Sequence, residues 1–162
     1  MIINRWGRGT FFLIALFVAF ACSERRQQSV GCDSLAVPAV GDRSALNHEV
    51  DYKAFNSTFL QPEVAKLYDI DRDEEIGVVM VSVYQKDALG VGVEACVSGG
   101  VTNLIGQINR LEFDEIREGR AIYHIGTFAF GQEEQLTFKV NVEIPATGKN
   151  HELKWQQKFW RG

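Results

Sequence analysis

The segment QLTFKVNVEI, residues 135–144, has the most regular pattern in the chain and decides the fold class. Five apolar side chains at 136, 138, 140, 142 and 144 alternate with five polar ones. Successive side chains of a β-strand point to opposite faces of the sheet, so this alternation predicts a half-buried strand.

Similar segments lie on both sides of this strand. Residues 48–54 and 151–160 alternate in the same way, whereas residues 76–84 (IGVVMVSVY) are apolar throughout, which is typical of a central strand covered on both faces. Further strand-like segments are expected at 91–97, 103–116 and 121–130. Turn-like stretches separate the segments at 86–90, 98–100, 117–120, 131–133 and 146–150. About seven strands with short connections predict an all-β fold, an antiparallel, immunoglobulin-like β-sandwich.

One short helix interrupts the strands. Pro62 suits the first helical position, where its missing N–H costs no hydrogen bond, and Glu63 suits the positive end of the helix dipole. We expect a two-turn helix at a sheet edge, packed through Leu60, Val64, Leu67 and Tyr68.

The first 21 residues, MIINRWGRGTFFLIALFVAFA, have the layout of a secretory signal peptide. Arg5 and Arg8 precede an apolar run of eleven residues from Phe11 to Ala21. As a helix this run would be about 16 Å long, too short for a hydrocarbon core of about 30 Å. The pattern therefore predicts export.

Two modes of cleavage stay open. Ala19-Phe20-Ala21 suits an ordinary signal peptidase, but Cys22 follows directly, and an apolar run ending in Ala-Cys resembles the lipobox of bacterial lipoproteins. That resemblance implies a triacylated Cys22 as a permanent membrane anchor, since two lipid chains already suffice for stable anchoring. Ser23 then implies sorting to the outer membrane. Ala19 and Phe20 depart from the lipobox pattern, so simple secretion is the alternative.

The chain thus divides into a signal peptide (1–21), a lipidated N-terminus with a flexible tether (22–47) and a β-sandwich domain (48–162). The tether is rich in Ser, Gln, Gly and charged residues and has no sustained period. As a random coil it would reach roughly 25–30 Å, enough to hold the domain clear of a bilayer.

Charge excludes one class of partner. The chain has 17 basic and 21 acidic residues, and removal of the leader leaves 15 against 21. Proteins that bind nucleic acid need a basic surface to neutralise phosphates, so we expect no nucleic-acid partner.

Metal and catalytic signals are weak. Asp69, Asp71 and Asp73 have the 1-3-5 spacing of a calcium loop, but an EF-hand needs Gly at its sixth position and Glu at its twelfth, where this chain has Glu74 and Met80. A solvated acidic turn is the simpler interpretation.

Histidines and motifs give no stronger signal. His48, His124 and His151 have no second ligand at metal spacing, and His124 is expected to be a hydrogen-bonded structural residue within a strand. No G-x-S-x-G, P-loop or H-E-x-x-H motif occurs. We therefore expect neither a cofactor nor an enzyme.

The three cysteines suggest one further feature. If Cys22 carries lipid, Cys32 and Cys96 are left as an even pair in an oxidising compartment, which favours a disulfide between them. Cys96 shares a strand face with Glu94 and Ser98, so we expect it on the more exposed side. A buried thiol at Cys96 is the alternative.

Four stretches resemble, in order and spacing, a family of small exported Gram-negative proteins known as domain of unknown function 4426. They are AFNSTFLQPEVAKLYDI, VSGGVTNLIGQ, LEFDEIREGRAIYHIGTF and EEQLTFKVNVEI. The resemblance covers most of residues 50–160 and implies an envelope protein, but no activity and no site residue.

These observations favour a lipoprotein on the periplasmic side of the envelope that acts as a non-catalytic binding or interaction module. Its partners would be the membrane, through the anchor, and an unknown envelope protein. The alternatives are a structural envelope component and, less favoured, an enzyme or metal protein with an unrecognised site. Trp160, beside two lysines on the outer face of the last segment, is a candidate contact residue, and an edge residue without a role is the simpler interpretation.

Overall fold

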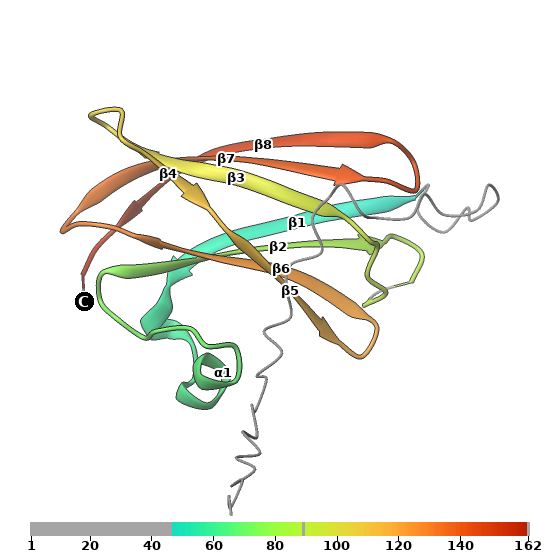
Figure 1. Cartoon of the computed structure of the whole chain (residues 1–162), viewed down its shortest axis with the longest axis horizontal. Coiled ribbons are helices and arrows are strands. Elements are labelled where there is room, and N and C mark those ends of the chain that lie inside the picture. The colour runs from blue at the N-terminus through green and yellow to red at the C-terminus, as the bar shows by residue number, and fades with distance from the viewer. Residues whose placement is uncertain (1–46, 89, 162) are drawn as a thin grey trace, which may run out of the picture.

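The computed structural model describes residues 47–88 and 90–161, which form two four-stranded antiparallel sheets packed face to face (Figure 1). The first sheet has the strand order β1-β2-β6-β5 and the second has the order β4-β3-β7-β8. The strands are β1 (His48–Asn56), β2 (Ile76–Gln85), β3 (Cys96–Asn103), β4 (Ile108–Leu111), β5 (Phe113–Glu118), β6 (Ala121–Ala129), β7 (Glu134–Ile144) and β8 (Lys149–Phe159). The predicted all-β sandwich is confirmed. Within the described part of the chain, no helix is long and apolar enough to cross a membrane.

Strand β7 has the predicted alternation. Its five apolar side chains are at most 3% exposed, and it pairs along its whole length with β8. In β8, Phe159 is buried and Trp155 packs against the core, whereas Trp160 just beyond the strand is 53% exposed. The predicted inward and outward faces of the last strand are therefore confirmed.

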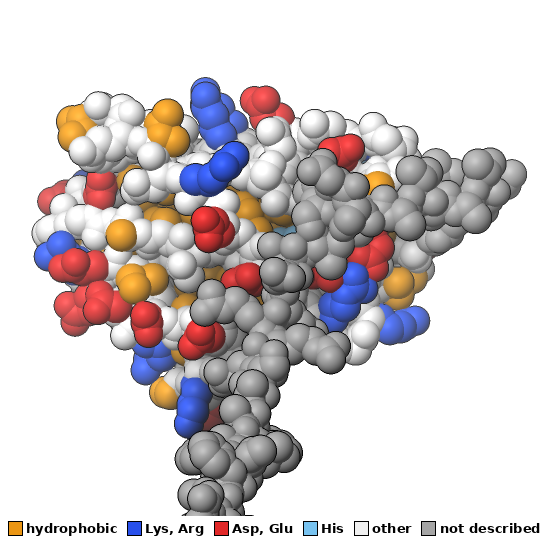
Figure 2. All heavy atoms as spheres, in the orientation of Figure 1, with side chains coloured by type: hydrophobic (Ala, Val, Ile, Leu, Met, Phe, Trp, Pro, Cys, Tyr) orange, Lys and Arg blue, Asp and Glu red, His pale blue; other side chains and the backbone are white. Residues whose placement is uncertain are grey.

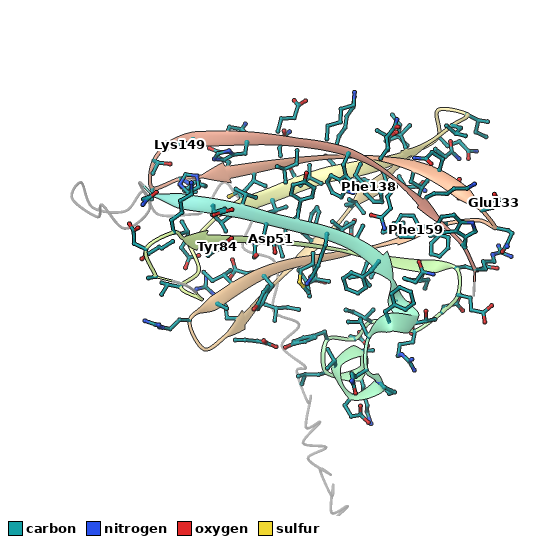
Figure 3. All side chains as sticks on the ribbon, turned by 180° about the vertical axis from the view of Figure 1, so that it is seen from behind. Asp51, Tyr84, Glu133, Phe138, Lys149 and Phe159 are labelled. Carbon is teal, nitrogen blue, oxygen red and sulfur yellow. The ribbon has the colours of Figure 1, made fainter. Side chains whose placement is uncertain are left out.

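Aromatic rings fill the space between the sheets. Phe138 stacks on Trp155 with ring centroids 4.7 Å apart, and Phe128 meets both Phe138 and Phe159 edge-on at 5.1 Å. Figure 3 shows Phe138 and Phe159 between the two layers. Gly77 lies opposite Phe128 in the sheet, and a Cβ atom on it would be 2.2 Å from the ring Cζ. The glycine thus leaves room for the ring.

The segment 103–116 was expected to be one strand but forms parts of two sheets. It contains the turn that follows β3, then β4, then β5. β4 pairs with β3 in the second sheet, whereas β5 pairs with β6 in the first. Glu112 is the single residue between β4 and β5. The chain therefore crosses from one sheet to the other over one residue.

The turn predicted at residues 98–100 is wrong, because these residues lie inside β3. Gly99 pairs with Val140 of β7, and a Cβ atom on Gly99 would be 2.5 Å from the carbonyl oxygen of Lys139. The glycine allows β3 and β7 to approach closely and does not reverse the chain. The preceding residues are mostly a connection, in which Val93 and Ala95 are nevertheless buried in the core.

The predicted helix is present as α1 (Pro62–Leu67), with Pro62 in its first turn. Its expected buried face is wrong, because Leu67 is 72% exposed and Ala65 is the buried residue. A helix of six residues has no continuous apolar stripe, and α1 packs through its smallest side chain while the longer ones extend outward. The Tyr68 hydroxyl, just after α1, donates a hydrogen bond to the Glu118 carboxylate on β5.

The edge strands β1 and β8 belong to different sheets and are joined by side chains. Tyr52 and Trp155 have ring centroids 4.6 Å apart, and Gln157 Nε2 donates to the carbonyl oxygen of Ala54 at 2.9 Å. Both pairs are 103 residues apart in sequence, so the two strands run side by side in the same direction. We call this row of side-chain contacts the β1–β8 seam.

Candidate functional site

The hairpin between β3 and β4 is closed by its own side chains. Asn103 Nδ2 donates to Gln107 Oε1 at 2.8 Å, and the Gln107 N–H donates to Asn103 Oδ1 at 2.9 Å. The backbone N–H of Asn103 donates to the Gln107 carbonyl at 3.1 Å, and Gly106 turns the chain with a φ of +84°. The four residues at the end of the hairpin are thus held in one conformation.

Apolar side chains project from this hairpin. Leu104 is 79% exposed, Ile105 80% and Ile108 74%. No charged residue occurs from Ala95 to Asn109. Figure 2 shows hydrophobic side chains at the upper left, where the hairpin end lies in Figure 1. We define the hairpin tip as Leu104, Ile105 and Ile108.

A hollow of about 230 Å³ lies beside the hairpin tip, against the turn between β6 and β7. Its lining combines the amides of Asn103, Gln107 and Asn109 with the carboxylate-bearing Glu134 and the aromatic Phe130. The amides of Asn103 and Gln107 in this lining are the ones that bond to each other across the hairpin.

A second hollow, of about 150 Å³, lies on the outer face of the first sheet and is lined by Ser82, Tyr84 and Tyr123 among others. Burial raises the pKa of Tyr84, and the carboxylates of Glu49 and Asp51 raise it further. Asp51 and Tyr84 are labelled in Figure 3. A phenol with a raised pKa stays neutral near pH 7 and can donate a hydrogen bond.

His124 is 4% exposed, and its Nε2 atom is 3.1 Å from the carbonyl oxygen of Ala95. Burial lowers its pKa, and the charge of Glu115, whose Oε2 is 3.8 Å from Nε2, opposes that shift. The expected structural, hydrogen-bonded role of His124 is confirmed.

Arg117 binds Glu115, the carboxylate near His124, and a second carboxylate as well. Its guanidinium makes a bidentate pair with Glu94 at 2.7 and 2.8 Å and donates from Nε to Glu115 at 2.7 Å. These contacts raise the pKa of Arg117, with the Glu94 hydrogen bonds as the largest cause. The cluster ties the segment before β3 to the edge strand β5.

The structure brings together two histidines that the sequence keeps far apart. His48 Nε2 and His151 Nε2 are 2.8 Å apart at the start of β1 and near the start of β8. Burial lowers the pKa of His151, and the nearby charges of His48 and Lys149 lower it further. The spacing of the histidines in the sequence does not predict this pair. The two residues are 103 positions apart and meet only because the β1–β8 seam aligns them.

The three aspartates of the acidic turn do not form a metal cluster. Within residues 47–88 and 90–161, no three His, Cys, Asp or Glu side chains converge on one point, so Asp69, Asp71 and Asp73 are not brought together. Asp73 instead shapes the turn, since its backbone exchanges hydrogen bonds with the buried hydroxyl of Ser57.

Of the three cysteines, only Cys96 lies in the described part of the chain, and it is 7% exposed. Cys96 pairs with Glu143 and so lies on the polar face of the sheet, as expected, but it is buried on that face and not exposed. Cys22, Cys32, the signal peptide and the tether through residue 46 lie outside the described residues. The bridge between Cys32 and Cys96 and the lipid on Cys22 stay predictions.

Comparison with known proteins identifies relatives but no activity. Residues 43–162 match the family model described as domain of unknown function DUF4426. A crystal structure of a DUF4426 family protein from Pseudomonas aeruginosa PAO1 is 33% identical, with a TM-score of 0.62 over 72% of this chain and 90% of that one. The curated proteins contain no match. Sequence, fold and family model agree, and the chain belongs to the DUF4426 family.

Proposed function

We propose that this domain is a non-catalytic interaction module of the bacterial envelope that binds a protein partner through the hairpin tip. The exposure of Leu104, Ile105 and Ile108, on a hairpin without charged residues, carries the proposal. Isolated exposed apolar residues are common on protein surfaces, but three neighbouring ones on a projecting hairpin form a contact surface. Burial of each such side chain contributes about 1.5–3 kcal/mol.

The rigidity of the hairpin supports this role. The hydrogen bonds between Asn103 and Gln107 fix the backbone that presents the tip before any partner arrives. A preorganised loop loses little conformational entropy on binding, so more of the contact energy appears as affinity.

The position of the tip favours a protein partner over the membrane that would hold the anchor. β1 begins at His48, which pairs with the last residue of β2. The hairpin follows the last residues of β3, at the other end of the sandwich. Figure 1 shows the hairpin and the start of β1 at opposite ends of the molecule. A lipid on Cys22 would attach through the tether at the β1 end, so the tip would be at the end of the domain farther from the anchor.

Site-specific photo-cross-linking in cells tests the proposal. A cross-linker in place of Ile105 should give one discrete protein adduct in the envelope. A cross-linker in place of Leu67, equally exposed on α1, is the matched control and should not give it. Leu104→Asp should remove the Ile105 adduct without changing the thermal unfolding midpoint.

Two outcomes would contradict the proposal. One is the same set of adducts from Ile105 and Leu67, which would indicate random collision. The other is flotation of the unlipidated Cys22→Ala protein with anionic lipid vesicles that is lost in Leu104→Asp, which would make the tip a membrane contact.

A further inference from the structure

We propose that His48 and His151 form a binding site for one divalent transition-metal ion of the Cu²⁺ or Ni²⁺ type, which would link the two sheets. The two rings come from edge strands of different sheets and bring their Nε2 atoms to 2.8 Å. Imidazole nitrogen is the preferred protein ligand for this class of metal ion.

The distance between the two nitrogens is compatible with one class of coordination geometry. Two nitrogens bound to one ion at about 2.0–2.1 Å are about 2.9 Å apart at a right angle, and about 3.4 Å apart at a tetrahedral angle. The observed 2.8 Å fits neighbouring positions of a square-planar or octahedral ion. Square-planar and tetragonal sites are typical of Cu²⁺ and Ni²⁺, and Cu²⁺ has the highest affinity of the first-row divalent ions.

The rings must tilt to bind an ion. They lie at 84° to one another with centroids 5.0 Å apart, so their Nε2 atoms face each other across the hydrogen bond. On binding, the shared proton would leave and each ring would turn its nitrogen lone pair toward the ion. Each histidine lies on the inward-facing side of a regular strand. Two residues after it on the same side, Val50 in β1 and Leu153 in β8 pack against the core. Both rings are partly buried, so the site is held in place and still open to solvent.

The described part of the chain offers the ion these two imidazole nitrogens. Among the residues that the structure describes, no third His, Cys, Asp or Glu joins the pair into a larger cluster. The affinity should therefore be that of a two-histidine chelate. Because only the folded chain aligns residues 48 and 151, the ion would bind the native state and stabilise it by mass action.

The test is a titration of the full exported protein with Cu²⁺ alone, followed by electron paramagnetic resonance and thermal unfolding. The native protein should bind one ion with imidazole-nitrogen couplings, and its unfolding midpoint should rise. Loss of an outer-shell partner of a metal site alone costs about ten- to a hundredfold in affinity, so loss of a ligand in His151→Gln should cost at least as much.

Two further variants make the result decisive. His48→Gln should reproduce the loss, which protects the conclusion if His151→Gln folds poorly. Glu152→Gln changes the next, exposed residue of β8 and should bind like the native protein. Equal affinity in the native protein and both histidine variants, a bound ion without imidazole couplings, or no binding by the native protein would overturn the proposal.

Discussion

His124 lies between the sheets with 4% of its surface exposed, and its Nε2 atom is 3.1 Å from the carbonyl oxygen of Ala95. Burial lowers its pKa below the usual 6.5, and the carboxylate of Glu115 offsets part of that effect. The unfolded chain therefore binds a proton more readily at this residue than the folded chain does. The stability that follows is fully present above about pH 6.5 and is lost as the pH falls below it.

We expect the urea midpoint of the native protein to fall between about pH 7 and about pH 5. His124→Gln keeps a side-chain donor near Ala95 but cannot titrate, so its midpoint should change less over this range. His151 has a lowered pKa for similar reasons and contributes with the same sign. His151→Gln is therefore measured beside His124→Gln, to separate the contributions of the two histidines. If the urea midpoint of His124→Gln depends on pH as steeply as that of the native protein, His124 is not a source of the pH dependence.

Gly77 is the second residue with a sharp structural requirement. In Gly77→Ala the new methyl group would be 2.2 Å from Cζ of Phe128, whose ring is packed among other aromatic rings. Overpacking of this kind costs about 1–3 kcal/mol, measurable by urea denaturation.

Gly131→Ala is the matched control for Gly77→Ala. Its Cβ would meet only a carboxylate oxygen of Glu134, at 3.4 Å, so the change should stay within about 0.5 kcal/mol. Equal losses in the two variants would show that Phe128 moves aside freely.

At the scale of elements, the β1–β8 seam determines how firmly the sheets are closed along one side. Gln157→Ala would leave the buried carbonyl of Ala54 without its side-chain donor. The cost should be about 1–3 kcal/mol. In Gln157→Ala, hydrogen exchange should accelerate more in β1 than in the central strand β2, relative to the native protein. The reason is that β1 has only one strand neighbour in its sheet.

The neighbouring residue provides the control for the seam. Gln156 points to the outer face and donates to the Thr137 hydroxyl at 3.2 Å. Gln156→Ala should change stability by no more than about 0.5 kcal/mol. A loss in Gln156→Ala as large as that in Gln157→Ala would contradict a specific role for the seam.

The elements differ in how well the sequence predicts them, for physical reasons. β7 is predictable because one of its faces is buried and the other is solvated, so apolar and polar residues alternate along its sequence. β3 is not predictable, because the Ser-Gly-Gly sequence around Gly99 is also typical of a turn. Gly99 is needed instead for close contact with Val140, 41 residues away in β7. The exposed face of α1 is likewise set by tertiary packing, since six residues are too few for a periodic signal.

The candidate sites follow the same rule. The role of His124 is predictable from its apolar neighbours within one strand, Ile122 and Ile125. The apolar residues of the hairpin tip look like part of a strand until pairing shows that Leu104 and Ile105 lie at a chain reversal. The His48–His151 pair depends on the register between two strands that share no backbone ladder, and no local pattern encodes it.

At the scale of the whole molecule, we predict that Cys22 carries the lipid anchor. Cells labelled with a clickable palmitate analogue should show a labelled protein in the membrane fraction. Cys22→Ala should abolish the label, and Cys32→Ala, the matched control, should keep it. A soluble mature protein that begins at Cys22 with a free amine would contradict the anchor.

The crossing at Glu112 gives the molecule a mechanical property. A force on the hairpin tip passes down β4 and, one residue later, into β5 on the other sheet. β5 in turn is tied by Arg117 to Glu94 and by Glu118 to Tyr68. Tension applied at the tip would therefore load both sheets together, in shear along their strands, and would not peel one strand away. A domain built in this way can carry a load at the tip while its own core stays closed.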